Sequence, residues 1–135
     1  MSFEVQHVNP PGMRRNPAFT NVVTVSGPHK RVIIGALDPV DENGALVGAG
    51  DLAAQTEQIF TNLEIALAAA GARLEDVVIW RIWVVAGHAL EPAAGVFMRV
   101  WNRRPDPPAN SIVYVPALAY PGSLVAVEAE AIVAA

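Results

Sequence analysis

Two glutamates near the C-terminal end of the sequence, Glu128 and Glu130, have types and spacing that suit chemistry. They lie two residues apart in a predicted strand, Leu124–Val133, so both side chains point to one face of a sheet. A carboxylate that is partly shielded by apolar walls can act as a general acid or base. The alternative for each is an exposed carboxylate, or one paired across subunits, and for Glu130 we favour that alternative. The opposite face of the strand is apolar, with Val125, Val127, Ala129 and Ala131.

Arg81 interrupts the apolar run Val77–Val85. A buried unpaired charge is expensive, so this guanidinium must find a partner or reach solvent. A glutamate at a subunit interface is the partner that we expect first. The sequence contains no metal-binding motif, because it has no cysteine and its histidines lack the spacing of metal ligands. We therefore expect no metal and no cofactor. The isolated histidines are His7, His29 and His88.

The composition predicts one domain, residues 1–135, that is unusually apolar. Hydrophobic residues make up 53%, charged residues only 16%, and the mean hydropathy is +0.34. So little charge would leave much apolar surface in water, which favours an oligomer. The net charge of −4 does not suit nucleic acid, whose phosphates attract clustered lysine and arginine. No apolar run is long enough to span a membrane and no signal peptide is recognised, so we expect a cytoplasmic protein.

Apolar periodicity and turn residues predict the order β-β-β-α-β-α-β-β. The strands are expected at Phe3–Val8, Asn21–Val25, Arg31–Ala36, Asp76–Val85, Ser111–Val115 and Leu124–Val133, with the second and third joined as a hairpin. One helix is expected from Asp51, a good N-cap residue, to Gly71, and the other begins near Pro92. This order predicts an α+β two-layer fold, with two helices on one face of a mixed six-stranded sheet. The other face would need a partner subunit.

Several ordered motifs resemble the Rid (YjgF-like, RidA-related) family of imine deaminases. They cover nearly the whole chain: Asn16-Pro17-Ala18-Phe19-Thr20, Ile34-Gly35-Ala36, Gln55, Asn62-Leu63, Ala69-Ala70-Gly71, Asp76-Val77-Val78, Pro108-Ala109-Asn110-Ser111 and Glu128-Ala129-Glu130-Ala131-Ile132. The resemblance implies a chorismate-mutase-like fold and a homotrimer with three small-molecule clefts between subunits. It also implies that Glu128 faces the cleft and orients a water.

The departures from the family pattern concern the substrate. Asn110 stands where the best-known members carry the arginine that grips a carboxylate, and Ala36 replaces a glutamine. The family tyrosine falls on Ala18 or Phe19, and the loop 116–123, with Tyr120, is longer than usual. The resemblance thus implies a substrate site formed by Asn110, Phe19, Gly35, Ile112 and Tyr120, and a possible substitute cation in Arg81.

Two functions follow from this resemblance. The first is an enzyme that hydrolyses or deaminates a small enamine, imine or related reactive metabolite other than the usual 2-imino acids. The alternative is a non-catalytic trimer that binds a small ligand. RNA cleavage, reported for some relatives, is disfavoured by the negative charge and by the absence of a histidine pair.

Overall fold

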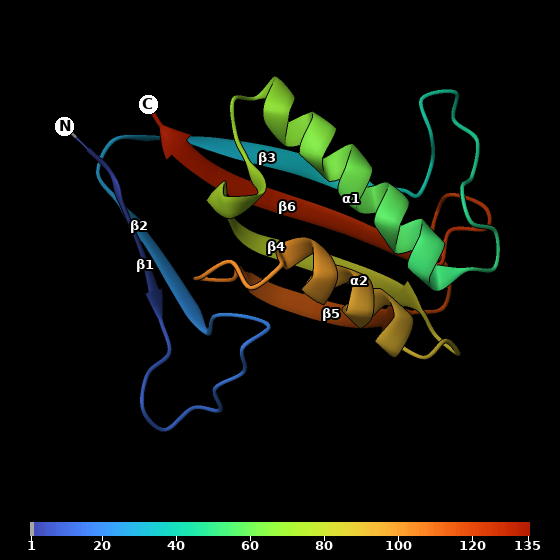
Figure 1. Cartoon of the computed structure of the whole chain (residues 1–135), viewed down its shortest axis with the longest axis horizontal. Helices are drawn as coiled ribbons and strands as arrows, with labels where there is room; N and C mark the ends of the chain where they lie inside the picture. Colours follow the sequence, from blue (N-terminus) through green and yellow to red (C-terminus); the bar gives the residue numbers. More distant parts are fainter. Residues whose placement is uncertain (1) are drawn as a thin grey trace.

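Four strands form the main sheet of the chain, in the order β3-β6-β4-β5, and two more form a separate ribbon, β1-β2 (Figure 1). The computed structural model describes residues 2–135. The elements are β1 (Glu4–Val8), β2 (Val22–Ser26), β3 (His29–Leu37), α1 (Leu52–Ala69), a short 3₁₀ turn (Leu74–Asp76), β4 (Val77–Val85), α2 (Glu91–Trp101), β5 (Ala109–Val115) and β6 (Val125–Ala134). The predicted order of strands and helices is confirmed.

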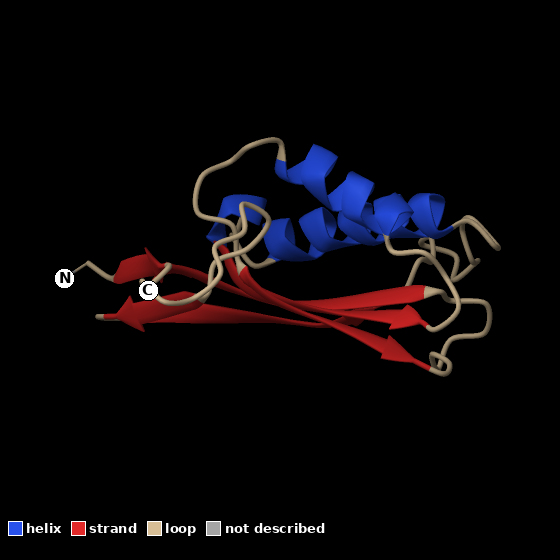
Figure 2. Cartoon of the chain, turned by 90° about the horizontal axis from the view of Figure 1, so that it is seen from below, coloured by secondary structure: helices blue, strands red, loops and turns tan. Residues whose placement is uncertain are grey.

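Both helices lie on one face of the main sheet, and the other face is bare in this chain (Figure 2). The α+β fold and the single covered face are therefore confirmed. The sheet is mixed, because β4 pairs parallel with β5 and antiparallel with β6. No helix of the described chain is long and apolar enough to cross a membrane.

The predicted hairpin between the second and third strands is wrong. β2 instead pairs antiparallel with β1, and β3 pairs antiparallel with β6, starting at His29 opposite Ala134. The six strands consequently form a four-stranded sheet and a two-stranded ribbon rather than one sheet. The link between β2 and β3 is only Gly27-Pro28, where Gly27 has a positive φ of 84°. Burial accompanies this change of partner: β3 buries Val32 and Ile34 beside the apolar face of β6, whereas no residue of β2 is buried.

The helices begin and end where local chemistry predicts. The Asp51 side chain accepts a hydrogen bond from the Ala54 N–H at 3.1 Å, which caps α1. α1 buries Ile59, Leu63 and Leu67 completely against the sheet. α2 packs above β4, where Trp80 makes edge-to-face contacts with three aromatic rings: Phe60, Phe97 and Trp101, at centroid distances of 5.8, 5.4 and 5.8 Å.

Gln55 on α1 joins two loops to the start of β6. Its fully buried amide donates to the Gly48 carbonyl at 3.2 Å and to the Gly122 carbonyl at 3.1 Å. Its oxygen accepts the Leu124 N–H at 2.7 Å. One side chain therefore satisfies backbone groups from two loops and a strand start, which positions the long 116–123 loop.

We expect Gln55→Leu to lower the free energy of unfolding by about 1–3 kcal/mol, because buried backbone groups would lose their partners. The control is Glu64→Leu, a change of similar size at an exposed position of α1, which should stay within about 0.5 kcal/mol. Urea unfolding followed by circular dichroism measures both. Equal stability of the Gln55→Leu variant and the wild type would show that Gln55 does not join these segments.

Candidate functional site

The strand β6 places carboxylates on one face and apolar side chains on the other, as predicted. Val125, Val127, Ala129 and Ala131 are buried in the core beneath the helices. Glu128 and Glu130 are half-buried on the bare face. The two-residue period of the strand is enough to explain this division.

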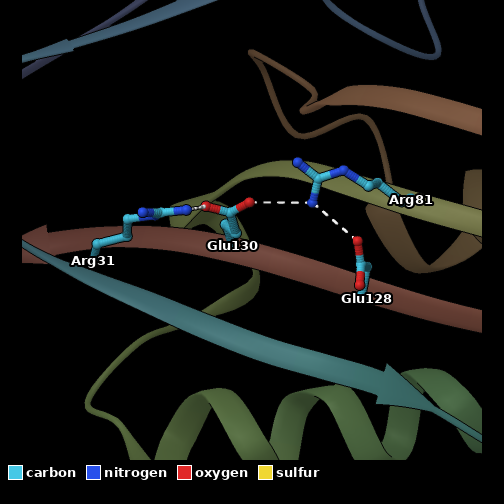
Figure 3. A network of polar contacts seen from close by, with 4 residues as sticks. All are labelled: Arg31, Arg81, Glu128 and Glu130. Atoms are coloured by element: carbon cyan, nitrogen blue, oxygen red, sulfur yellow. Dashed lines mark hydrogen bonds and ion pairs between the residues drawn. The ribbon is translucent and has the colours of Figure 1, made fainter.

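Arg81 joins the two glutamates on the bare face (Figure 3). Its Nη1 lies 3.1 Å from Glu128 Oε1 and 3.1 Å from Glu130 Oε2. Arg31 on β3 approaches the other oxygen of Glu130 at 2.6 Å. The partner expected for Arg81 is therefore found, but within its own chain. Since its guanidinium is already bound to two carboxylates, Arg81 is poorly placed to bind a ligand anion from this position.

The network fixes the charge of Glu130. Burial acts to raise the pKa of this carboxyl, but hydrogen bonds and ion pairs with Arg31 and Arg81 outweigh it, so the pKa of Glu130 is lowered. The hydrogen bond that Arg81 donates to Glu130 is the main cause that raises the pKa of Arg81. Glu130 is thus an ionised counter-ion at neutral pH, in agreement with its predicted structural role.

Two exposed apolar side chains, Ile33 and Val113, lie on strands that flank this charged network. Ile33 pairs with Glu130 across the strands and is 66% exposed. On β5, Ser111 lies opposite Arg81, and Val113, two residues further along the same face, is 47% exposed. Exposed branched residues around a satisfied charge cluster are typical of a surface that a partner covers.

A cavity of about 620 Å³ lies on the other side of the sheet, between α2 and strands β4 and β5. Asn110 and Ile112 line it from β5, and Trp80 and Ile82 line it from β4. Within its described lining there is no aspartate, glutamate or histidine. The described residues also contain no cluster of side chains that could hold a metal ion. The cavity can therefore bind an organic molecule but has no acid or base of its own.

Thr20 anchors the segment before β2 to the residues that precede β5. Its N–H donates to the Pro108 carbonyl at 3.2 Å and its hydroxyl to the Pro107 carbonyl at 2.5 Å. This contact holds Pro17 and Ala18 in the cavity lining, beside the start of β5. Of the two candidates for the family tyrosine position, Ala18 lines the cavity and Phe19 does not.

The remaining predicted site residues lie elsewhere in the chain. Gly35 is exposed on β3, where the pairing with β6 shifts register. The Tyr120 hydroxyl donates to the Gly44 carbonyl and so ties two loops together. Neither residue lines the cavity.

Asn110 and Glu128 lie on opposite faces of the sheet within one chain, so the expected cleft between subunits, with both residues facing it, stays a prediction. Asn110 pairs with Trp80, and Glu128 pairs with Arg81. Because Trp80 and Arg81 are consecutive on β4, their side chains leave opposite faces of the sheet. The predicted residues thus divide between the cavity and the bare face.

Sequence reasoning missed the polar rim of the cavity. Arg99, Arg103 and Arg104 contribute to the lining, together with Asn102. The signal available in the sequence was the pair Arg103-Arg104, directly after the predicted helix and before Pro105. Nothing in the sequence shows that the end of this helix faces the start of β5, because that contact depends on how α2 packs.

Comparisons with known proteins agree with the overall fold. The family model described as Endoribonuclease L-PSP matches residues 16–134. The Rid-family protein YyfB from Yersinia pestis, of unknown function, is 36% identical, with a TM-score of 0.82 over 94% of this chain and 97% of its own. A member of the YjgF/YER057c/UK114 family from Mycobacterium tuberculosis is 32% identical, with a TM-score of 0.63 over 96% and 100% of the two chains.

No curated protein matches the sequence. The yeast protein YEO7, at 22% identity and a TM-score of 0.64 over 98% of this chain and 100% of its own, shows the fold alone. The family match spans most of the chain, and the two structures above 30% identity cover nearly all of it. The chain therefore belongs to the Rid (YjgF-like) family.

Proposed function

We propose that the chain assembles as a homotrimer whose subunits form small-molecule clefts. In these clefts it hydrolyses or deaminates a small enamine, imine or related reactive metabolite other than the usual 2-imino acids. The observation that carries this proposal is the apolar cavity with the Asn110 amide in its lining. Membership of the Rid family supports a small-molecule function in general.

Asn110 argues against a small carboxylate as the group held at this point. A guanidinium binds a carboxylate through two parallel charge-assisted hydrogen bonds. An asparagine side chain is neutral, and its donor and acceptor suit an amide, a hydroxyl or a carbonyl. A hydrogen bond to a charged group is worth about 1.5–3 kcal/mol, so its loss weakens binding roughly ten- to a hundredfold.

Catalysis requires a second subunit. Glu128, the proposed catalytic residue, is on the bare face, and the cavity is on the helix face. The edges of the main sheet are β3, with Gly35, and β5, with Ile112. If edges of neighbouring subunits come together, the backbone groups of these two residues would flank the cleft. A carboxylate from the neighbouring bare face would then reach the ligand and orient water.

The alternative is a trimer that binds a small ligand without converting it. One observation favours it: the described cavity lining contains no group that titrates near neutral pH. A ligand would then be held by apolar contacts and the amide alone. RNA cleavage, which the description of the family model names, is not favoured by the net charge of −4.

Turnover of 2-iminopropionate and 2-aminoacrylate should be weak or absent, because Asn110 lacks the carboxylate grip. A coupled assay that generates these imines in situ measures it, with an arginine-bearing family member as the reference. Turnover equal to that of the reference would contradict the proposed substrate restriction. A metabolite that raises the melting temperature without any product would favour the binding alternative over the enzyme.

Asn110→Arg should raise the affinity for 2-oxobutyrate, by up to about tenfold, because it restores a bidentate anion site in the cavity. The gain is limited because Arg103 already supplies a positive charge in the lining. Asn110→Gln is the matched control, since it lengthens the side chain without adding charge. Calorimetric titration compares the variants. No gain in an Asn110→Arg protein that keeps its assembly would mean that this position does not face a carboxylate-sized site.

A further inference from the structure

The walls of the cavity are built from aromatic rings. Trp80, Phe97 and Trp101 all line it, and Trp80 lies 5.4 Å from Phe97 and 5.8 Å from Trp101 between ring centroids. Its volume of about 620 Å³ falls in the range of roughly 300–1,000 Å³ that is typical of pockets for drug-sized ligands. A three- or four-carbon acid would leave most of this space to water. The cavity therefore suits a ligand with a ring or another bulky apolar body.

Two of the three arginines in the lining are already neutralised by the chain. Arg99 forms an ion pair with Glu57 on α1. Arg104 lies 3.4 Å from Glu75 between Nε and Oε1, and it also donates to the carbonyls of Val100 and Trp101 at 2.5 and 3.0 Å. Their charges are committed to holding the end of α2.

Arg103 differs from both neighbours. It is exposed, and among residues 2–135 no carboxylate or carbonyl accepts a hydrogen bond from its side chain. Its backbone has a positive φ of 58°, directly after Asn102 at 51°. Asparagine is a common left-handed residue at a helix end, but a second such residue that is arginine is unusual. The Arg104 N–H donates to the Trp101 carbonyl at 3.1 Å, which keeps this turn at the cavity edge.

We propose that Arg103 binds the anionic group of a ligand whose aromatic or bulky apolar body occupies the cavity between α2 and β5. The proposal rests on the proposed small-molecule function and narrows its ligand class to an apolar organic anion. An unpaired guanidinium beside an apolar, carboxylate-free lining is the arrangement that recognises such a molecule. Asn110, which also lines the cavity, is then free to hold a neutral polar group.

The test uses three ligands and three proteins. The ligands are 3-phenylpropionate, its neutral analogue 3-phenylpropionamide, and propionate, which lacks the ring. The proteins are the wild type, Arg103→Gln and the control Arg73→Gln, whose side chain is 76% exposed and outside the cavity. Calorimetric titration measures affinity, and melting temperatures confirm that the exposed substitutions leave the fold intact.

We expect the wild type to bind 3-phenylpropionate more tightly than propionate. Arg103→Gln should lower the affinity for 3-phenylpropionate about tenfold or more and leave the affinity for 3-phenylpropionamide unchanged. The control Arg73→Gln should bind both ligands as the wild type does. If Arg103→Gln binds 3-phenylpropionate as well as the wild type does, the role of Arg103 is overturned while the small-molecule site stands. If the wild type does not bind 3-phenylpropionate, the ligand class is overturned, and the 2-oxobutyrate titrations decide separately on the proposed function.

Discussion

The two-residue period of β4 is the constraint on which the rest of the structure depends. Trp80 points beneath α2 and forms the floor of the cavity, and the next residue, Arg81, points to the bare face and binds two glutamates. The neighbouring strands follow the same alternation, with Asn110 opposite Trp80 and Glu128 opposite Arg81. One strand thus separates the cavity from the charged network, and no rotamer change within a chain can bring the two together.

This separation gives the charged network a structural meaning. Arg31, Arg81, Glu128 and Glu130 satisfy one another on a face that also exposes Ile33 and Val113. When a partner covers such a face, a paired cluster avoids most of the penalty of burying lone charges. Charge pairs of this kind also fix register between partners more than they add affinity. Glu128 forms one ion pair in this network and Glu130 forms two. Glu128 is therefore the carboxylate that can turn toward a neighbouring cleft with the fewer ion pairs lost.

Much of the fold could be predicted from the sequence because local signals and burial agree. The alternation of β6, the Asp51 cap and the spacing of Ile59, Leu63 and Leu67 each specify one element without outside information. The hairpin was predicted wrongly because two β-branched runs joined by a glycine-containing link have the same sequence pattern whether they pair with each other or with other strands. β3 pairs with β6, almost a hundred residues away, whereas β2 pairs with β1.

The candidate site was less predictable for a related physical reason. Motifs placed Asn110, Ile112 and the 16–20 segment near one another, and the structure brings Ala18, Asn110 and Ile112 into one lining. The arginines of that lining depend on the angle at which α2 ends over β5, which no short-range pattern encodes. The relation between Asn110 and Glu128 stays a prediction about two subunits. A motif gives positions along the chain, and within one chain the two residues lie on opposite faces of the sheet.

We propose that this chain completes its site only with a second subunit. Light scattering on a size-exclusion column at micromolar concentration tests it most directly. We expect one species with three times the 14.3 kDa mass of a single chain. A stable monomer would leave Glu128 unable to reach the cavity and would contradict both the assembly and the site between subunits.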